Sequence, residues 1–242
     1  ACIIFPVSIL LDGSLTKIER DRIFVIYIIA FFVIFFWAAY EQAGASLTLF
    51  AAEQTDRTIF GWEMPASWIQ SFNPFFVVIL AAIMPSVWGA LNKRGMEPAS
   101  PTKQAIGLLL LSLGYLVICF GVKDVQPGVK VSLIWLTGLY FIHTMGEIAL
   151  SPIGLSMVNK LTPVRFASLM MGIWYLSTST ANKFAGTLGG LYPEDGKVKT
   201  LLGFRIETMF DFFMVFVIMS GVASLILFLL SKKLQKMMHG VE

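Results

Sequence analysis

The stretch that decides the fold is residues 23–51, which read IFVIYIIAFFVIFFWAAYEQAGASLTLFA. It is almost wholly apolar and carries a single charged side chain, Glu41. A helix of about 20 apolar residues crosses the hydrocarbon core of a bilayer, which is about 30 Å thick. Irregular backbone cannot face lipid, because its unpaired amides would have no partners there. We therefore predict a transmembrane helix over this stretch.

Five further apolar segments of similar length follow, separated by loops that contain glycine, proline and charged residues. Together they predict an all-α membrane protein with six transmembrane helices, at approximately residues 23–51, 68–91, 104–122, 131–158, 164–190 and 206–230. Residues 1–22 are predicted to be a truncated preceding helix with a cytoplasmic linker, and residues 231–242 a cytoplasmic tail. We expect the chain to be a fragment of a longer protein.

Composition and charge agree with this class of protein. Of the 242 residues, 57% are hydrophobic and only 14% are charged, whereas soluble chains carry about 25% charged residues. A secreted, nucleic-acid-binding or disordered protein is therefore excluded. Eleven of the 18 lysines and arginines lie at one set of predicted helix ends and six at the opposite set, with Lys183 inside a span. The positive-inside rule then predicts that both termini are cytoplasmic.

Two glutamates lie deep within their predicted spans. Along the helix axis, Glu41 is about 18 Å and Glu147 about 20 Å from the nearer charged end. Ionisable groups at such depth are expensive, so each is a candidate functional residue. A carboxylate there can take up and release a proton as its surroundings change, which is the property that proton coupling requires. The alternative is that each glutamate only pairs with a cation on a neighbouring helix.

The two glutamates also occupy matching positions, in the first and the fourth span, 19 residues after Arg22 and 17 after Lys130. If the six spans form two triplets, the second triplet enters the membrane from the opposite side. This predicts a 3+3 inverted repeat, in which substrate and coupling ion bind near the midplane between the repeats.

Other polar groups accompany these acids. In the fourth span, a stripe with helical spacing is predicted to face a cavity, and it contains Tyr140, Thr144, Glu147, Ser151 and Gly154. Pro152 predicts a kink or partial unwinding next to Glu147, with a purely structural kink as the alternative. His143 is favoured as a packing residue over a proton relay.

Two further spans contribute candidates. Asn73 precedes a proline in the second span, and Trp174 shares a face with hydroxyl side chains in the fifth, where it can wall a binding pocket. The alternative for those hydroxyls is close helix packing by small residues.

Motifs for ATP binding, for a His-Glu-x-x-His metal site and for a potassium filter are missing from the sequence. We expect neither a metal nor a cofactor. A membrane-embedded enzyme, with Glu41, Glu147 and His143 as acid–base groups, is a weaker hypothesis because no nucleophile is evidently paired with a base. A non-catalytic membrane scaffold is a further alternative.

Four segments, in this order, resemble the proton-dependent oligopeptide transporter family, a branch of the major facilitator superfamily. They are FFWAAYEQAGASLTLF (Phe35–Phe50), SFNPFF (Ser71–Phe76), GEIALSPIGLS (Gly146–Ser156) and the stretch from LTP at Leu161 to MMGIWYLS ending at Ser177. The resemblance runs from Lys17 to about Lys233. It implies the C-terminal six-helix bundle of a major facilitator transporter, because the family's Glu-x-x-Glu-Arg-Phe-x-Tyr-Tyr motif belongs to the first six helices and is missing here.

The resemblance further implies proton-coupled symport of di- and tripeptides by alternating access, with the proton as coupling ion. In the family, the glutamate matching Glu147 pairs with the peptide amino group and the one matching Glu41 serves proton coupling and outer gating. Asn73 and Trp174 match residues that line the peptide pocket, and Ser151 is a weaker match.

The partners implied by the resemblance are the peptide, the lipid bilayer and the N-terminal six-helix bundle of the same transporter, with no nucleic acid. The location implied is the cell (inner) membrane. Alone, the chain is expected to be inactive. A major facilitator transporter of another small solute is the nearest alternative.

Overall fold

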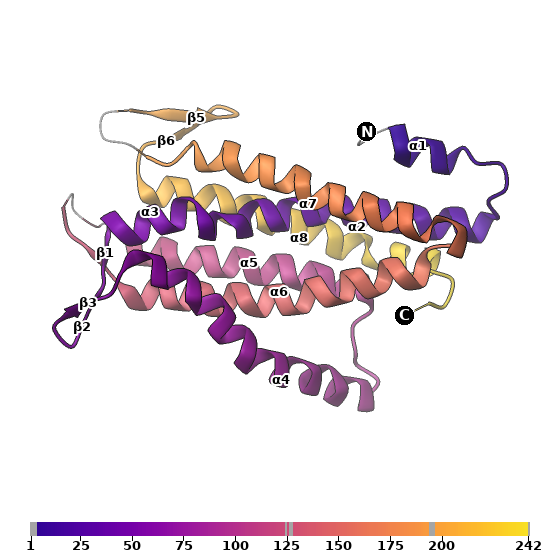
Figure 1. The fold of residues 1–242 in the computed structure, drawn as a ribbon, viewed down its shortest axis with the longest axis horizontal. Coiled ribbons are helices and arrows are strands. Elements are labelled where there is room, and N and C mark those ends of the chain that lie inside the picture. The colour runs from indigo at the N-terminus through magenta and orange to yellow at the C-terminus, as the bar shows by residue number, and fades with distance from the viewer. Residues whose placement is uncertain (1–3, 124, 126–127, 194–196, 242) are drawn as a thin grey trace.

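The computed structural model describes residues 4–123, 125, 128–193 and 197–241, and helices dominate it (Figure 1). The α-helices are α1 (Ile4–Leu10), α2 (Lys17–Tyr40), α3 (Ser46–Glu53), α4 (Phe72–Lys93), α5 (Ser100–Val122), α6 (Leu133–Leu161), α7 (Ala167–Gly189) and α8 (Met209–Met237). The 3₁₀ turns are η1 (Glu41–Gly44), η2 (Ala66–Ser71) and η3 (Val164–Phe166).

Short strands form three pairs near one end of the bundle. A parallel pair joins β1 (Thr55–Asp56) to β4 (Val131–Ser132). Antiparallel pairs join β2 (Thr58–Ile59) to β3 (Trp62–Glu63) and β5 (Lys199–Leu201) to β6 (Phe204–Ile206). All three pairs lie at the end opposite the two chain termini (Figure 1).

A helix occupies each of the six predicted ranges. Within the described residues, five helical segments are long and apolar enough to cross a membrane, and they are Lys17–Glu53, Ala66–Lys93, Ser100–Val122, Leu133–Leu161 and Met209–Met237. The remaining helix is α7, which occupies the fifth predicted range. It is less apolar because it carries Ser177, Asn182 and Lys183 among other polar residues. The all-α membrane fold is confirmed, whereas the count of six membrane spans stays a prediction.

Helix ends differ from the predicted ends where the polar residues flanking an apolar run also favour a helix. α2 begins at Lys17 because Thr16 caps it: Glu19 N donates to Thr16 Oγ1 at 3.2 Å and Thr16 N donates to Glu19 Oε2 at 2.8 Å. α8 continues to Met237, into the predicted tail, because lysines extend a helix readily. Residues 1–3 and 242, in the predicted terminal segments, lie outside the described residues.

The first predicted span, residues 23–51, is not one continuous α-helix. α2 ends at Tyr40, η1 follows, and Ala45 leaves helical geometry with φ −123° and ψ −101° before α3 begins. Gln42, which is fully buried, holds this break together. Its Nε2 donates to the carbonyls of Ala38 (3.2 Å) and Ala185 (2.9 Å), and its Oε1 accepts from Ser46 Oγ (2.6 Å). One side chain thus bridges the break and ties it to α7.

The fourth span differs from the first. α6 is one continuous helix from Leu133 to Leu161 with Pro152 inside it, so the predicted partial unwinding beside Glu147 is wrong, while the alternative of a kink stays a prediction. Close by, Gln104 of α5 donates from Nε2 to the carbonyl of Leu150 at 2.9 Å. Because α5 and α6 pack closely, this amide supports α6 within one turn of the proline.

The helix pairs follow a two-fold pattern. α5 packs against α8, α2 packs against α7, and α4 packs against α6. When the triplet of α2, α4 and α5 is exchanged with the triplet of α6, α7 and α8, the α2–α7 and α4–α6 pairs become each other and the α5–α8 pair becomes itself. The contacts of α5 with α6 and of α8 with α2 are exchanged in the same way. This is the packing expected of the predicted 3+3 inverted repeat.

The bundle is unevenly filled. α2 and α5 carry many buried side chains, whereas the buried residues of α4 are Leu80 and Met84, and its far end diverges from the other helices (Figure 1). Close packing between α5 and α6 depends on glycine, because a Cβ on Gly107 would lie 2.8 Å from Leu150 Cβ.

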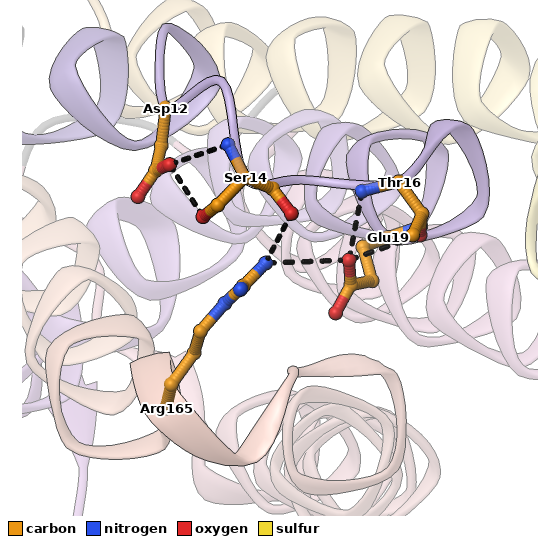
Figure 2. Close-up of polar contacts among 5 residues, drawn as sticks. All are labelled: Asp12, Ser14, Thr16, Glu19 and Arg165. Carbon is orange, nitrogen blue, oxygen red and sulfur yellow. Dashed lines mark hydrogen bonds and ion pairs between the residues drawn. The ribbon is translucent and has the colours of Figure 1, made fainter.

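A polar cluster joins the segment before α2 to the turn after α6 (Figure 2). Arg165 of η3 donates to the carbonyl of Ser14 at 3.0 Å and pairs with Glu19 Oε2 at 3.3 Å. Asp12 accepts from both the backbone N (2.8 Å) and the hydroxyl (2.5 Å) of Ser14, and these hydrogen bonds lower the pKa of Asp12.

The two termini lie at the same end of the bundle (Figure 1). His239 Nε2 lies 2.8 Å from Asp21 Oδ2, and Arg22 Nε donates to the carbonyl of Met238 at 3.2 Å. These contacts hold the end of α8 against the start of α2.

Candidate functional site

Three polar side chains, from α2, α4 and α6, converge around Glu147. Tyr40 Oη donates to Glu147 Oε2 at 2.5 Å, and Asn73 Nδ2 donates to the same oxygen at 2.9 Å. Asn73 Nδ2 also contacts Thr144 Oγ1 at 3.2 Å and hydrogen-bonds to Tyr40 Oη. The structure therefore brings together two residues predicted as site residues, Asn73 and Glu147, although they are 74 positions apart.

Each member of this cluster is placed by its helix. Tyr40 is the last residue of α2, Asn73 lies in the first turn of α4, and Glu147 lies midway along α6. The Tyr40 ring stacks on Phe36 at a centroid distance of 5.5 Å. Thr144 is fully buried one turn before Glu147, while Tyr40, Asn73 and Glu147 are half-buried. The carboxylate is thus held inside the bundle but stays within reach of a ligand.

Tyr40 is the site residue that the sequence analysis missed. The available signal was its position directly before Glu41 in the most diagnostic stretch of the chain. A tyrosine in an aromatic run is usually assigned to packing, however, and nothing in the spacing indicates that its hydroxyl reaches α6.

Glu41 lies beside this cluster without joining it. It begins η1, directly after Tyr40, and its side chain is exposed. Within the described residues, the ion pairs of the chain include neither glutamate. The alternative that each glutamate pairs with a cation on a neighbouring helix of this chain is therefore not supported.

Trp174 lies apart from the cluster, in the interior. It is 4% exposed and packs on Gly154 of α6, where a Cβ would lie 2.6 Å from the indole Cζ2. Ser177 is also buried and donates to the carbonyl of Trp174 at 2.6 Å, in agreement with a packing role for this hydroxyl. Ser151 is half-buried one turn after Glu147. The roles assigned to Ser151 and Trp174 in peptide binding stay predictions.

The polar stripe of the fourth span faces the interior of the bundle over much of its length. Tyr140 and Thr144 are at most 2% exposed, and only Glu147 and Ser151 are half-buried. Phe72 and Asn73 of α4 contact Tyr140 and Thr144, so this part of the stripe is packed against protein. A cavity beside Glu147 and Ser151 stays a prediction.

His143 has the environment of a packing residue. It is buried between α5 and α6, and its Nε2 lies 3.1 Å from the carbonyl oxygen of Leu111. Gly114 makes room for the ring, since a Cβ there would lie 2.3 Å from His143 Cδ2. The imidazole nitrogen thus contacts α5 and not Glu147. In the part of the chain that the structure describes, no group of three or more His, Cys, Asp and Glu residues is arranged to bind a metal.

The chemistry of this arrangement is that of a cation site. Both hydrogen bonds that the described residues make to the Glu147 carboxylate come from neutral donors and end on Oε2. A carboxylate can accept further bonds on its second oxygen. A primary ammonium group is the complementary ligand, because it supplies both charge and donors.

Comparison with known proteins identifies the family. The family model described as the POT family, PTR2, matches residues 14–202. The peptide transporter YePEPT of Yersinia enterocolitica is 37% identical over 185 residues, which cover 76% of this chain and 36% of that protein. Dipeptide and tripeptide permease A of Escherichia coli K12 is 30% identical over 90% of this chain and 43% of the permease.

Solved structures agree. A crystal structure of a peptide transporter POT in complex with sulfate is 30% identical and superimposes with a TM-score of 0.86 over 99% of this chain and 46% of that one. A POT family transporter in complex with 5-aminolevulinic acid has a TM-score of 0.81 at 28% identity, over 96% of this chain and 46% of that chain. The chain thus spans less than half of the length of these relatives. It is a multi-pass membrane protein, and it belongs to the POT family of transporters.

Proposed function

We propose that this chain forms the C-terminal half of a proton-coupled symporter of di- and tripeptides that works by alternating access. Its partners are the lipid bilayer and an N-terminal six-helix bundle of the same transporter. The proposed location is the cell (inner) membrane, with both termini cytoplasmic. Membership of a transporter family and the peptide transport named for its relatives support this proposal.

The single observation that carries the proposal is the environment of Glu147. Its carboxylate is oriented by two neutral donors, Tyr40 and Asn73, and it forms no ion pair with the described residues. A peptide binds there through its free amino terminus. The ammonium group then supplies the positive charge that this half of the site lacks.

Proton coupling is assigned to Glu41. It lies at the one place where the first span is broken, and its side chain is exposed. Broken helices at the midplane are typical sites of coupling ions in secondary transporters. No cofactor is required, because the proton gradient drives transport. By itself the chain is not expected to transport, because the resemblance assigns half of the binding site to the N-terminal bundle.

The experiment is Glu147→Gln in the full-length transporter, reconstituted in vesicles with an imposed proton gradient. Uptake of dialanine falls at least about tenfold, because the amide cannot pair with the ammonium group and a lost charged hydrogen bond is worth roughly 1.5–3 kcal/mol. Membrane insertion is unchanged. The control is Glu207→Gln, which alters only an exposed ion pair with Arg205. Normal uptake by the Glu147 variant would sink the role assigned to this residue.

Transport of another small solute is the second candidate, and a structural neighbour in complex with 5-aminolevulinic acid favours it. Competition separates the two. Excess unlabelled dipeptide suppresses uptake by a peptide transporter, whereas indifference to dipeptides with sensitivity to 5-aminolevulinic acid would identify the other solute as substrate.

A further inference from the structure

The Glu147 carboxylate is asymmetrically bonded. Tyr40 Oη and Asn73 Nδ2 both donate to Oε2, at 2.5 Å and 2.9 Å. A glutamate side chain rotates freely about its terminal bond unless one oxygen is held. With Oε2 held by two donors from two other helices, Oε1 has a fixed direction and its lone pairs remain available to a ligand.

We propose that Tyr40 is a positioning residue for the substrate amine: its hydroxyl fixes Oε2 of Glu147 so that Oε1 receives the ammonium group. This inference rests on the proposed function of Glu147. Tyr40 touches the carboxylate and not the peptide, and it acts by orienting the group that binds. Preorganisation of this kind increases affinity because the bound geometry is already present before the ligand arrives.

The Tyr40 ring is suited to this role because it is rigidly held. It stacks on Phe36 with an interplanar angle of 17° and packs edge-on against Trp37 at 5.4 Å. Phe36 and Trp37 both belong to α2, as Tyr40 does, so the position of the Tyr40 hydroxyl is set within this one helix. Asn73 is hydrogen-bonded to the same hydroxyl, which links α4 to this arrangement as well.

The position of Tyr40 also connects the carboxylate to the broken span. Tyr40 ends α2 and Glu41 begins η1. A change in the backbone at the break therefore moves the hydroxyl that orients Glu147.

A competing role for Tyr40 is that of a latch, in which the hydroxyl occupies the place of the ammonium group and must be displaced by it. The geometry disfavours this role, since the hydroxyl and the amide share one oxygen and leave the other to the ligand. The two roles predict opposite changes in the KM for peptide uptake when the hydroxyl is removed. Loss of a positioning hydroxyl raises KM, whereas loss of a latch lowers it.

The test is Tyr40→Phe in the full-length transporter, with Tyr140→Phe as the matched control. The Tyr140 hydroxyl is buried and has no hydrogen-bond partner within the described residues, so its removal changes little. For dialanine uptake, Tyr40→Phe raises KM roughly tenfold, the effect of one lost hydrogen bond to a charged group, and leaves Vmax within about twofold. An unchanged or lower KM would overturn the proposal.

A second ligand separates positioning from a general structural effect. N-acetyl-dialanine lacks the ammonium group, so its inhibition constant against dialanine uptake is the same in the wild type and in Tyr40→Phe. An equal loss for both ligands would show that Tyr40 supports the pocket as a whole, and the proposal would be wrong. Binding of dialanine to the purified full-length protein, followed by tryptophan fluorescence, gives the same comparison without transport.

These outcomes are distinct from a failure of the proposed function. If the wild-type transporter does not take up dipeptides, or Glu147→Gln leaves uptake intact, the proposed function fails. If both results are as expected and Tyr40→Phe behaves like Tyr140→Phe, only the role of Tyr40 fails.

Discussion

The first and the fourth span are counterparts in the inverted repeat, yet they are built differently. The first span has no proline and is broken, with α2 and α3 separated by η1 and Ala45. The fourth contains Pro152 and is continuous through α6. Each carries one glutamate, Glu41 at the break and Glu147 on the unbroken helix.

The difference teaches that a helix breaks where other groups can satisfy its backbone, and not simply where a proline occurs. At the break, the Gln42 amide bonds carbonyls on both α2 and α7. Beside Pro152, the Gln104 amide supports a continuous helix instead. Glu147 therefore lies on a continuous helix, whereas Glu41 lies where the first span is broken.

The largest expected effect is that of removing the Gln42 amide, which holds the break in the first span. Gln42→Leu keeps a buried side chain of similar size but removes the hydrogen bond to the Ala185 carbonyl and leaves the Ser46 hydroxyl without its Gln42 acceptor. Unfolding becomes easier by about 1–3 kcal/mol for each buried group left unsatisfied, and uptake is lost because the joint is no longer held. Thermal unfolding of the purified protein measures this.

The matched control is Gln70→Leu, because Gln70 is exposed and bonds only Thr48 Oγ1 among the described residues. Its unfolding temperature changes little. Equal stability of the two variants would mean that the break does not depend on Gln42.

A smaller effect is expected from replacing Pro152, which lies inside the continuous fourth span. Pro152→Ala returns a backbone N–H to a helix that is already continuous but also gives the unfolded chain more freedom. The two effects oppose each other, so stability changes by less than about 1 kcal/mol, and uptake is retained. The control is Pro85→Ala, the corresponding change inside α4. Loss of uptake by Pro152→Ala alone would show that α6 moves during transport, and the contrast between a rigid and a jointed span would fail.

The smallest effect concerns the link between the two spans. Arg165 follows α6 and holds the segment before α2 through Ser14 and Glu19 (Figure 2). Since this ion pair is partly exposed, Arg165→Ala costs at most about 1 kcal/mol, and the loss shrinks at high salt. Chemical denaturation at two salt concentrations measures it, with Arg205→Ala as the exposed control. A large effect that does not depend on salt would contradict a surface role.

Much of the fold was predictable because long apolar runs can be buried only in lipid or in a bundle. The sequence analysis found every helical range of the bundle, and the resemblance in four segments indicated the family. Glu147 was selected because an ionisable group deep in an apolar span is expensive, whereas Asn73 was selected through the resemblance. The ends of α2 and α8 were missed because capping residues and lysines extend a helix beyond its apolar part.

What the sequence determined by itself is the membrane class, the order of the spans and the depth of the two glutamates, because these depend on composition and on distance along one helix. The tertiary structure alone decided that Tyr40 reaches Glu147 across 107 residues, that Gln42 holds a break, and that Trp174 packs on Gly154. These contacts depend on which sides of the helices pack against each other. Spacing along the chain carries no information about that, since side-chain hydrogen bonds form between helices only after they have packed.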